Sequence, residues 1–392
     1  ARKPMRQQKI RKRKATKAPN IYDVAQRAGV SVFTVSAVIN NNGQVSSPLR
    51  RRVEAAIQTL NYRPNLLARS LAKRQTHTIG MIVPDIANPY FPLVVRGAED
   101  EAQKGGYSVL LCNSDNQPQK EEQYLELLLS KRVDGILITK APGPFTPLQR
   151  RMLSDAKVPI VLVMRTCPGL VADAVLADDL QAAFEAVSHL ARLGYHRIAF
   201  VGGPLNVSNA RGRWQGFRKA LKAYRLSYDS ELVVEGNYRV DSGYRAGLTL
   251  LPRRPDAVYV ANYLMAVGFI KAAQEIGMRC PEDFGLVSFD DYPWLECFHP
   301  RLTTIDLPRY ELGAEAARTL LARMKGKPGP PTVVKLASQL IVRESCGFKL
   351  RGRNSKRPPR INPALEGGNE GSPLLPNGKE GAAPFRPALK KE

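Results

Sequence analysis

The sequence predicts an all-α head joined to an α/β body that contains two doubly wound, parallel-sheet subdomains. Three observations support this multidomain fold class. The chain has 392 residues, more than one compact core usually holds. Residues 20–75 have the composition and spacing of short helices. From Thr78 onward, apolar runs alternate with amphipathic segments, which is typical of α/β domains.

The head begins with two short helices separated by a tight turn, predicted over Tyr22–Ala28 and Val32–Asn40. Gly29 can adopt a positive φ in the turn without steric cost, and Ser31 is a favoured N-cap for the second helix. A third helix is predicted over Ser47–Leu60. Apolar residues that would pack the first two helices together are Val24, Ala25, Ala28, Val30, Val35 and Val38. This pattern is a helix-turn-helix, whose second helix enters the major groove of DNA.

Seven apolar runs of strand length follow the head: Ile79–Val83, Ser108–Cys112, Gly135–Thr139, Ile160–Met164, Ile198–Gly202, Ala257–Ala261 and Gly285–Phe289. Helical segments between them include Lys120–Lys131, Leu180–Leu193 and Arg211–Ala223. Continuous apolar strands that alternate with helices indicate parallel sheets covered on both faces. About a dozen such elements exceed one sheet, so two subdomains are expected.

Positive charge is concentrated at the two ends of the chain. Of the net charge of +24, residues 1–19 contribute +9, residues 20–76 and 349–392 contribute +6 each, and residues 77–348 only +3. A basic head on a nearly neutral body is typical of a nucleic-acid-binding protein with a separate second domain. Residues 1–19 are predicted to be a disordered basic arm, and the Pro/Gly/Arg-rich residues 349–392 a disordered tail.

The composition excludes several classes of protein. No apolar run approaches the ~18 residues of a membrane span, and no signal-peptide apolar region follows the basic N-terminus, so a cytoplasmic protein without membrane contact is expected. Met5 is a candidate for the true start. Five dispersed cysteines argue against a disulfide framework or a zinc site. There is no P-loop, and Gly202 and Gly203 belong to no GxGxxG motif, so neither an enzyme nor a metal or cofactor is expected.

The head resembles that of the lactose-repressor (LacI) family over Ile21–Asn40, Val45 and Asn61–Leu71, and the resemblance continues through Thr78–Asp85 to about Ser345. It implies a sequence-specific DNA-binding transcriptional regulator, in most cases a repressor, whose operator affinity is set by a small-molecule effector. The body of this family is periplasmic-binding-protein-like, with ligand bound between two subdomains. The resemblance places crossovers between the subdomains near residues 177, 307 and 336.

In this family the second helix of the head reads the operator, and the positions that match its base-reading residues are Val32, Phe33 and Ala37. Ala37 cannot read guanine as the arginine of many relatives does, whereas Val32 and Phe33 suit thymine methyl groups. Small hydroxyl side chains near a helix N-terminus suit phosphate contact. The DNA-binding candidates in the helix-turn-helix are Ser31, Val32, Phe33, Thr34, Ser36, Ala37 and Asn40, and Arg50, Arg51 and Arg52 lie on the third helix.

Residues 65–76 resemble the family's hinge helix and linker, between a DNA-binding domain at 20–64 and an effector-binding and dimerisation domain at 77–348. The hinge helix forms on operator binding and lies in the minor groove. Leu71 matches the leucine that wedges into the central base step and kinks the duplex. The other hinge candidates are Asn65 and Arg69, and Lys73 and Arg74 suit phosphate contact.

Seven residues at predicted strand ends are candidates for effector binding: Asn88, Tyr90, Phe91, Arg165, Arg213, Asn262 and Asp290. An aromatic side chain after the first strand can stack on a sugar face while Asn88 bonds a hydroxyl. The resemblance matches Arg213 to an arginine that bridges two ligand hydroxyls, Asn262 to the family's Asn-Asp pair, and Asp290 to the first acid of its Phe-Asp-Asp motif.

Three positions depart from the sugar-binding pattern: Met164 replaces Asp, Leu307 replaces Gln, and Tyr263 replaces the second member of the Asn-Asp pair. Arg165 and Arg213 would then face one ligand-facing acid. This balance favours an anionic effector, a sugar acid or sugar phosphate, over a neutral sugar.

A homodimer is expected, because one recognition helix reads only a short half-site. The resemblance suggests Phe91–Lys104 as part of its interface, and residues 349–392 contain no heptads of the kind that make relatives tetrameric. Two alternatives remain open. The chain could be a solute-binding protein without DNA activity, or a regulator that has lost its effector response and acts constitutively.

Overall fold

The computed structural model describes residues 19–40, 45–63 and 75–351. The chain divides into two compact units, the head at Ala1–Thr76 and the body at His77–Glu392. Within the described ranges, no helix is both long and apolar enough to cross a membrane.

Three helices form the head: α1 (Ile21–Ala28), α2 (Val32–Ile39) and α3 (Ser47–Leu60). α1 starts with a capping box, in which the Asn20 side chain accepts from the backbone of Asp23 and the Asp23 carboxylate accepts from the backbone of Asn20. Gly29 ends α1 at φ 63°, and Ser31 caps α2 by accepting from the backbone of Thr34. The predicted turn and cap are therefore present, and α2 ends one residue earlier than predicted. The head has its own small core of Val24, Ala25, Ala28, Val35, Val38, Val53, Ala56 and Tyr62.

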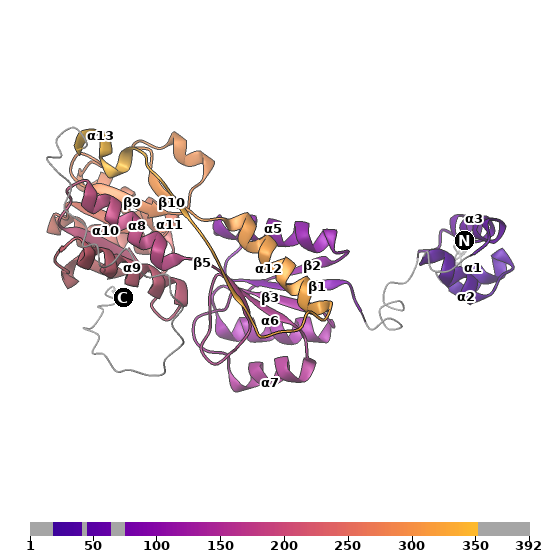
Figure 1. Cartoon of the computed structure of the whole chain (residues 1–392). Helices are drawn as coiled ribbons and strands as arrows, with labels where there is room; N and C mark the ends of the chain where they lie inside the picture. Colours follow the sequence, from indigo (N-terminus) through magenta and orange to yellow (C-terminus); the bar gives the residue numbers. More distant parts are fainter. Residues whose placement is uncertain (1–18, 41–44, 64–74, 352–392) are drawn as a thin grey trace, which may run out of the picture. The chain divides into compact units, whose positions relative to one another are not determined.

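The N-terminal subdomain of the body is built on a six-stranded parallel sheet in the order β11-β5-β4-β3-β1-β2. Its strands are β1 (Thr78–Val83), β2 (Ser108–Asn113), β3 (Gly135–Ile138), β4 (Ile160–Val163), β5 (Asp173–Ala177) and β11 (Val333–Leu336). Its helices are α5 (Tyr90–Lys104), α6 (Pro118–Ser130), α7 (Pro147–Ala156) and α12 (Arg309–Met324). α5 and α12 lie side by side on one face of the sheet, and α6 and α7 cover the other (Figure 1).

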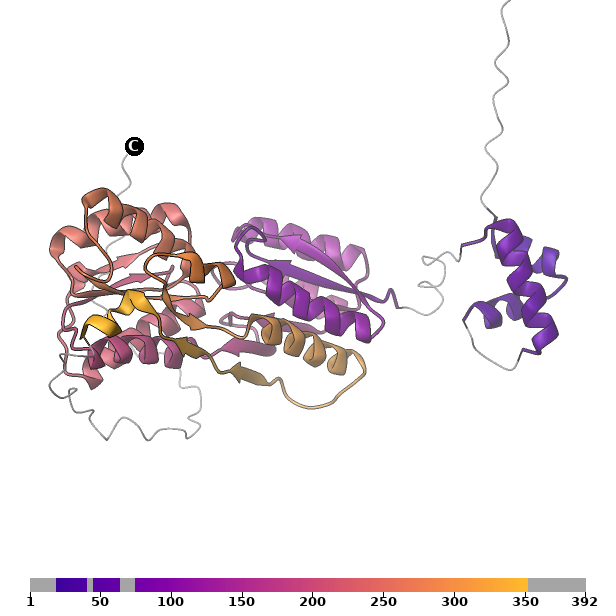
Figure 2. The same ribbon diagram turned by 90° about the horizontal axis from the view of Figure 1, so that it is seen from above.

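The C-terminal subdomain is built on a second six-stranded sheet, in the order β12-β10-β9-β8-β6-β7. Its strands are β6 (Ile198–Gly202), β7 (Val233–Glu235), β8 (Ala257–Val260), β9 (Gly285–Phe289), β10 (Thr303–Asp306) and β12 (Gln339–Ile341). Its main helices are α8 (Asp179–Arg192), α9 (Ser208–Ala223), α10 (Val240–Leu250) and α11 (Tyr263–Ile276), paired as α8 with α9 and α10 with α11 (Figure 2). Four 3₁₀ turns, η1 (Ser230–Leu232), η2 (Leu251–Arg253), η3 (Pro293–Cys297) and η4 (Glu344–Cys346), and the short α13 (Phe348–Arg351) complete it.

The chain passes between the subdomains three times. β5 of the first sheet leads into α8, β10 of the second sheet leads into α12 over the first sheet, and β11 leads back into β12. The two doubly wound sheets and the all-α head confirm the predicted fold class. At one edge of the second sheet the short β12, which follows the last crossover, runs antiparallel to β10.

Glycines let the paired helices α5 and α12 approach closely. A Cβ atom on Gly97 of α5 would overlap the backbone carbonyl of Tyr310 in α12. A Cβ on Gly313 of α12 would overlap the carbonyl of Val94 in α5. The two backbones therefore pack directly against each other, which fixes α12 on the N-terminal subdomain although it follows a strand of the other.

Candidate functional site

Helix α2, the second helix of the helix-turn-helix, presents one large apolar side chain to solvent. The Phe33 side chain is 82% exposed, while Ser31 is exposed and Thr34, Ser36 and Ala37 are half-buried. The hydroxyl oxygens of Ser31 and Thr34 lie 2.9 Å apart. The Phe33 ring can therefore contact an apolar partner without any rearrangement of the core of the head.

Asn40 follows α2 and is turned back onto it. Its side-chain amide donates to the carbonyl of Ser36 at 2.8 Å and to the Ser36 hydroxyl at 3.1 Å. On α3, Arg51 and Arg52 are exposed, and Arg52 donates to the carbonyl of Gly29 at 3.3 Å, which ties α3 to the turn. The hinge candidates Asn65, Arg69 and Leu71, together with Lys73 and Arg74, lie outside the described residues.

In the body, one cavity between the two subdomains, here termed the effector cleft, is lined by every effector-binding candidate: Asn88, Tyr90, Phe91, Arg165, Arg213, Asn262 and Asp290. These residues follow β1, β4, β6, β8 and β9, so they meet at the carboxyl edges of both sheets. Open α/β sheets bind ligands at this edge. The structure therefore brings together residues separated by up to 202 positions, from Asn88 to Asp290.

The N-terminal wall of the cleft consists of buried aromatic and cationic groups. Tyr90 and Phe91 start α5, with their rings edge to face at 5.2 Å. Asn88 accepts from the backbone of Tyr90 at 3.0 Å and so forms a side-chain turn just before this helix. Arg165 is 4% exposed and donates to the Asn116 side chain at 2.8 Å and to the Lys140 carbonyl at 3.0 Å. Burial lowers the pKa of Arg165.

Arg213, on α9, belongs to the C-terminal wall and is held on several sides. Its Nε donates to Asp179 at 2.7 Å, one Nη donates to the carbonyl of Ala261, and the guanidinium lies 3.9 Å from the ring centre of Phe289. Burial alone would lower the pKa of Arg213, but the charge of Asp179, together with smaller contributions from Tyr238, Asp290 and Tyr259, outweighs it and raises the pKa. The second Nη has no hydrogen bond to any described residue and remains available to a ligand.

Asp290 and Met164 occupy equivalent places at the ends of β9 and β4, and both adopt left-handed backbone angles, φ 69° and φ 66°. Non-glycine residues adopt this conformation at a cost, so the two strand ends hold their side chains in fixed directions. Asp290 Oδ2 accepts from the backbone of Tyr263 at 3.5 Å. Burial raises the pKa of Asp290.

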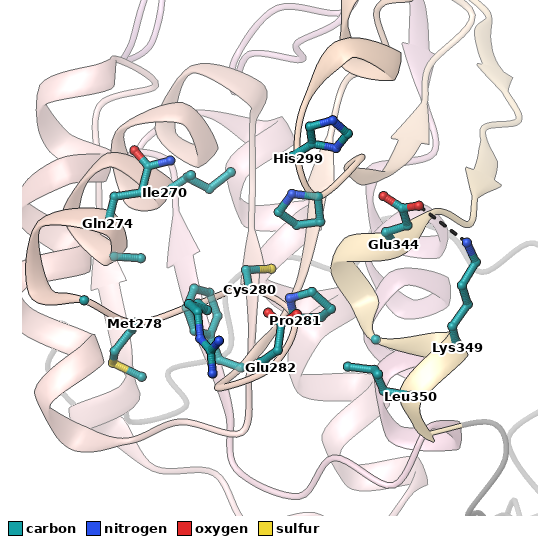
Figure 3. Close-up of a pocket in the computed structure, with 16 residues that line it drawn as sticks. Ile270, Gln274, Met278, Cys280, Pro281, Glu282, His299, Glu344, Lys349 and Leu350 are labelled. Atoms are coloured by element: carbon teal, nitrogen blue, oxygen red, sulfur yellow. Dashed lines mark hydrogen bonds and ion pairs between the residues drawn. The ribbon is translucent and has the colours of Figure 1, made fainter.

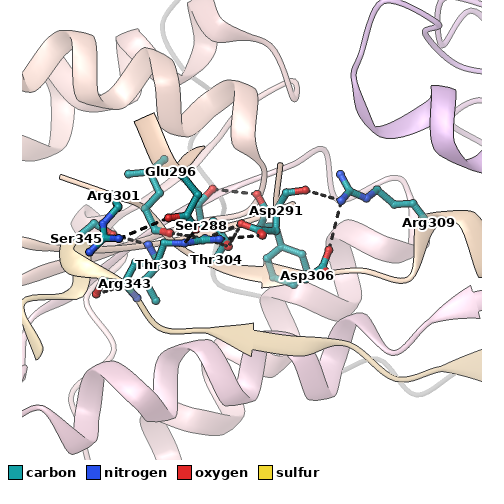
Figure 4. Close-up of polar contacts among 12 residues, drawn as sticks. Ser288, Asp291, Glu296, Arg301, Thr303, Thr304, Asp306, Arg309, Arg343 and Ser345 are labelled. Atoms are coloured by element: carbon teal, nitrogen blue, oxygen red, sulfur yellow. Dashed lines mark hydrogen bonds and ion pairs between the residues drawn. The ribbon is translucent and has the colours of Figure 1, made fainter. Parts of the chain in front are cut away.

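The loop after Asp290 is anchored by the polar network in Figure 4. Arg343 donates to both carboxylate oxygens of Asp291, at 2.6 and 3.0 Å, and Thr304 donates to Asp291 at 2.7 Å. Arg309, at the second crossover, donates to the Asp291 carbonyl and to Asp306. The second acid of the Asp-Asp pair is therefore structural, and it fixes the position of the first.

Both polar atoms of the Asn262 side chain form hydrogen bonds within the protein. Its Oδ1 accepts from the backbone of Met265 at 3.0 Å, and its Nδ2 donates to the carbonyl of Tyr238 at 3.1 Å. It caps α11 and holds the loop that carries Tyr238. Burial raises the pKa of Tyr238 to about 12. Asn262 thus shapes the cleft by hydrogen bonding inside the protein.

Five buried polar atoms of cleft-lining residues lack a hydrogen-bond partner among the described residues: Tyr90 Oη, Arg165 Nε, Asn209 Oδ1, Tyr238 Oη and Asp290 Oδ1. They come from both subdomains. A buried polar atom without a partner costs roughly 1–3 kcal/mol. A polar, hydroxyl-rich molecule that supplied those partners would therefore bind favourably here.

Sequence reasoning missed several cleft residues. Asn209 and Tyr238 line the cavity, but the helix predicted from Arg211 starts at Ser208, and the missed turn carries Asn209. No side-chain cap marks the start of α9, and Tyr238 lies in a loop without periodicity. The position of Asn209 on the first turn of a helix could have been found only from a stronger cap signal.

The sequence-based charge count is also wrong. It paired two arginines with one acid, but Asp179 forms a buried ion pair with Arg213, and Asp85 and Arg239 also line the cleft. Asp179 and Asp85 were missed because an acid's distance from the cleft depends on the tertiary fold. With them included, the positive and negative charges around the cleft are balanced, and the basis for preferring an anionic ligand disappears.

The effector cleft is narrow in this structure, with about 40 Å³ of space. Small-molecule sites usually have about 300–1,000 Å³. Arg239 lies 4.0 Å from Asp85 across the cleft, and beside the cleft Ser208 accepts from the backbone of Thr166 at 2.9 Å, so both contacts join the two subdomains. A sugar-sized ligand therefore requires the subdomains to move apart before it can enter.

A larger cavity of about 670 Å³ lies in the C-terminal subdomain, between the end of α11 and the turn at α13 (Figure 3). Phe284, just before β9, forms part of the lining of this cavity, so the cavity lies at the amino ends of the strands. No atom of its lining residues is among the buried, unpartnered polar atoms of the described chain. The smaller cleft is the better candidate because polar groups converge there.

A helix-turn-helix head attached to a body with a polar cleft between two doubly wound subdomains defines a DNA-binding regulator with an effector-binding domain. Residues 20–65 match the family described as bacterial regulatory proteins, lacI family, and residues 187–346 match the periplasmic binding protein-like domain. The chain belongs to the LacI family of bacterial transcriptional regulators, and it is not an enzyme.

Three similar proteins each align with this chain over nearly their whole length. The transcriptional regulator DegA of Bacillus subtilis (strain 168) is 33% identical over 329 residues, which cover 83% of this chain and 97% of DegA. The lac repressor dimer bound to operator and the anti-inducer ONPF is 30% identical, with a TM-score of 0.76, covering 84% of this chain and 99% of that one. The regulator CelR in complex with cellobiose is 32% identical, with a TM-score of 0.64, covering 83% and 99%.

Proposed function

We propose that this protein is a repressor that binds its operator as a homodimer, and that a small, hydroxyl-rich effector in the cleft controls operator affinity. The observation that carries the proposal is the set of five buried, unpartnered polar atoms contributed by both subdomains. A ligand that bonds both walls at once stabilises one arrangement of the subdomains over another. The sugar ligand of the similar regulator CelR supports this effector class.

A neutral sugar or neutral sugar derivative fits the cleft best. The cations Arg165, Arg213 and Arg239 are balanced by Asp85 and Asp290, which line the cleft, and by Asp179, which is bound to Arg213. Tyr90 and Phe91 offer an aromatic surface for an apolar sugar face. Arg213 Nη and Asp290 Oδ1 offer a donor and an acceptor for neighbouring hydroxyls.

For operator binding, we propose that α2 enters the major groove and that Phe33 contacts thymine methyl groups. Residues 65–76 would fold as paired hinge helices only on DNA, because isolated helices shorter than about 12–15 residues are marginal in water. Opening or closing of the cleft changes the separation of the two N-terminal subdomains in the dimer. A coupling of about 1–3 kcal/mol between effector and operator is enough for regulation.

Fluorescence anisotropy with labelled operator DNA, with and without a panel of sugars, tests the proposal. Operator sequences are first selected from random DNA. We expect Arg213→Ala to retain operator binding and lose the response to sugar. We expect Leu71→Ala to weaken operator binding and reduce DNA bending, with sugar affinity of the free protein unchanged.

Two results contradict the proposal in different ways. If no sugar alters operator binding by the wild-type protein, the regulator acts constitutively or responds to another class of ligand. If selection enriches no DNA sequence, the chain is a solute-binding protein without specific DNA activity.

A further inference from the structure

A second cavity, here termed the crossover pocket, adjoins the effector cleft where the chain passes between the subdomains. Its volume is about 230 Å³, more than five times the 40 Å³ left in the cleft itself. Residues beside the first and third crossovers, Asp178 and Lys335, line it together with Gln215 of α9. It is therefore formed by both subdomains, as the effector cleft is.

Met164 and Asn209 line both cavities, so the two are neighbours separated by these side chains. Asn209 is 3% exposed, and its Oδ1 has no partner among the described residues. Met164 is unbranched at Cβ and its side chain adapts readily to different neighbours. A ligand bound in the effector cleft could thus extend past Met164 and supply the missing partner of Asn209.

The charged side chains that line the crossover pocket balance one another: Asp178 and Asp179 against Arg211 and Lys335. Lys335 lies 4.0 Å from Asp178, and Arg211 donates to the carbonyl of Leu205 at 3.1 Å. Gln215 is exposed and offers both a donor and an acceptor. Such a surface suits a neutral group with several hydroxyls better than a phosphate or carboxylate, for which an excess of cations would be needed.

We propose that the effector consists of two linked sugar units, one in the effector cleft and the other in the crossover pocket. This inference rests on the proposed function of the cleft and adds the size of its ligand. Because the second unit would lie against residues 178 and 335, it would contact two of the three segments that join the subdomains. The second unit would then favour one separation of the subdomains directly.

The test compares monosaccharides with disaccharides on the full-length protein. Thermal-shift screening followed by calorimetry uses glucose, galactose and ribose against cellobiose, lactose, maltose and sucrose. We expect at least one disaccharide to bind ten times more tightly than any of the monosaccharides. Gln215→Trp, which fills the crossover pocket, should reduce disaccharide affinity at least tenfold and leave monosaccharide affinity within twofold.

Lys222→Trp is the matched control, because Lys222 is exposed two turns further along α9 and does not line the pocket. Lys335→Ala gives a milder test should the tryptophan disturb folding. If monosaccharides bind as tightly as disaccharides, or if both pocket variants bind disaccharides like the wild type, the two-unit inference is overturned and the single-unit effector site stands. If no sugar in the panel binds, the proposed sugar effector fails together with it.

Discussion

Arg213 donates from Nε to Oδ1 of Asp179 at 2.7 Å, and both side chains are almost completely buried. Asp179 is the first residue of α8, directly after the first crossover, and Arg213 lies on α9. The pair therefore connects the start of one helix to the middle of its partner. The second Nη of Arg213, a residue that lines the effector cleft, has no hydrogen bond to any described residue.

Asp179→Asn should destabilise the body strongly, because it leaves the positive charge of Arg213 buried without a counter-charge. Removing one partner of a buried ion pair costs about 3–5 kcal/mol. Urea denaturation should show this loss, and the double variant Asp179→Asn/Arg213→Met should recover part of it. The control is Asp241→Asn, which breaks the exposed pair with Arg245 and should cost less than about 1 kcal/mol. Equal costs for the two single variants would contradict a buried, charged pair.

Phe33→Ala should weaken operator binding about tenfold without changing the free energy of unfolding. The ring is 82% exposed, so its removal leaves no cavity in the head. Loss of one base contact costs about 1–3 kcal/mol. Anisotropy with operator DNA measures the affinity, and thermal denaturation measures stability. Leu148→Ala, an exposed position on α7, should change neither. An unchanged operator affinity would remove Phe33 from the base-reading surface.

The sequence predicted most of the fold because its signals are local. Gly29 and Ser31 define the turn of the head by their own conformational preferences, and continuous apolar runs define buried parallel strands. The short β12, with three residues, has no such run, and its antiparallel pairing depends on where the last crossover places it.

The site was predicted less completely than the fold. Seven effector candidates do meet at one cavity: four were predicted from their places at strand ends, and Arg213, Asn262 and Asp290 from the family resemblance. The pairing of Asp179 with Arg213 spans 34 positions and two helices, and no local pattern announces it. Asn262 has the expected place but uses both its polar atoms inside the protein. Which polar atom stays free for a ligand is decided by tertiary contacts.

Gly97→Ala should lower the stability of the body by about 1–3 kcal/mol, the usual cost of overpacking. Its Cβ would overlap the backbone of α12, which cannot turn aside as a side chain can. Thermal unfolding of the variant measures the effect. The control is Ser130→Ala at an exposed position of α6, which should change the free energy of unfolding little. Gly143→Ala would not serve as a control, because the positive φ of Gly143 strains any other residue there. A Gly97→Ala protein as stable as the wild type would show that α5 and α12 can separate freely.

His189 should make the protein less stable in mild acid. Burial, assisted by the charge of Arg192, lowers the pKa of His189 to about 4 from an ordinary value of 6.5. The unfolded state therefore binds the proton more readily. The stabilising contribution of neutral His189 is complete above pH 6.5 and is lost as the pH falls toward 4. Between these two pH values the free energy of unfolding can fall by up to about 1.4 kcal/mol for each pH unit.

Urea denaturation at pH 5 and pH 7 checks this dependence. His189→Gln should reduce the difference between the two values, whereas His196→Gln, at an exposed position, should preserve it. A pH dependence that is the same in the wild type and in His189→Gln would assign the effect to other groups.

Leu111→Glu should weaken the proposed homodimer. Leu110 and Leu111 are 37% and 39% exposed on β2, the outer edge strand of the first sheet, and Leu93 on the neighbouring α5 is 42% exposed. Exposed apolar side chains on an edge strand usually have a partner. Sedimentation at micromolar concentration should show more monomer for Leu111→Glu. Leu127→Glu, at an exposed position on α6, should sediment like the wild type.

The three crossovers also determine when this protein can fold during its synthesis. The first sheet lacks an edge strand until Val333–Leu336 has left the ribosome, and the second lacks one until Gln339–Ile341 follows. The three helices of the head end at Leu60, so a nascent chain carries a finished head for most of the time that both sheets are incomplete. A message truncated before the codon for Val333 would thus encode a head joined to two sheets in which β5 and β10 are left as exposed edge strands, which invite aggregation and degradation. The ribosome must therefore translate nearly to the end of the body before the product can be regulated. A shorter product would contain only the finished DNA-binding head.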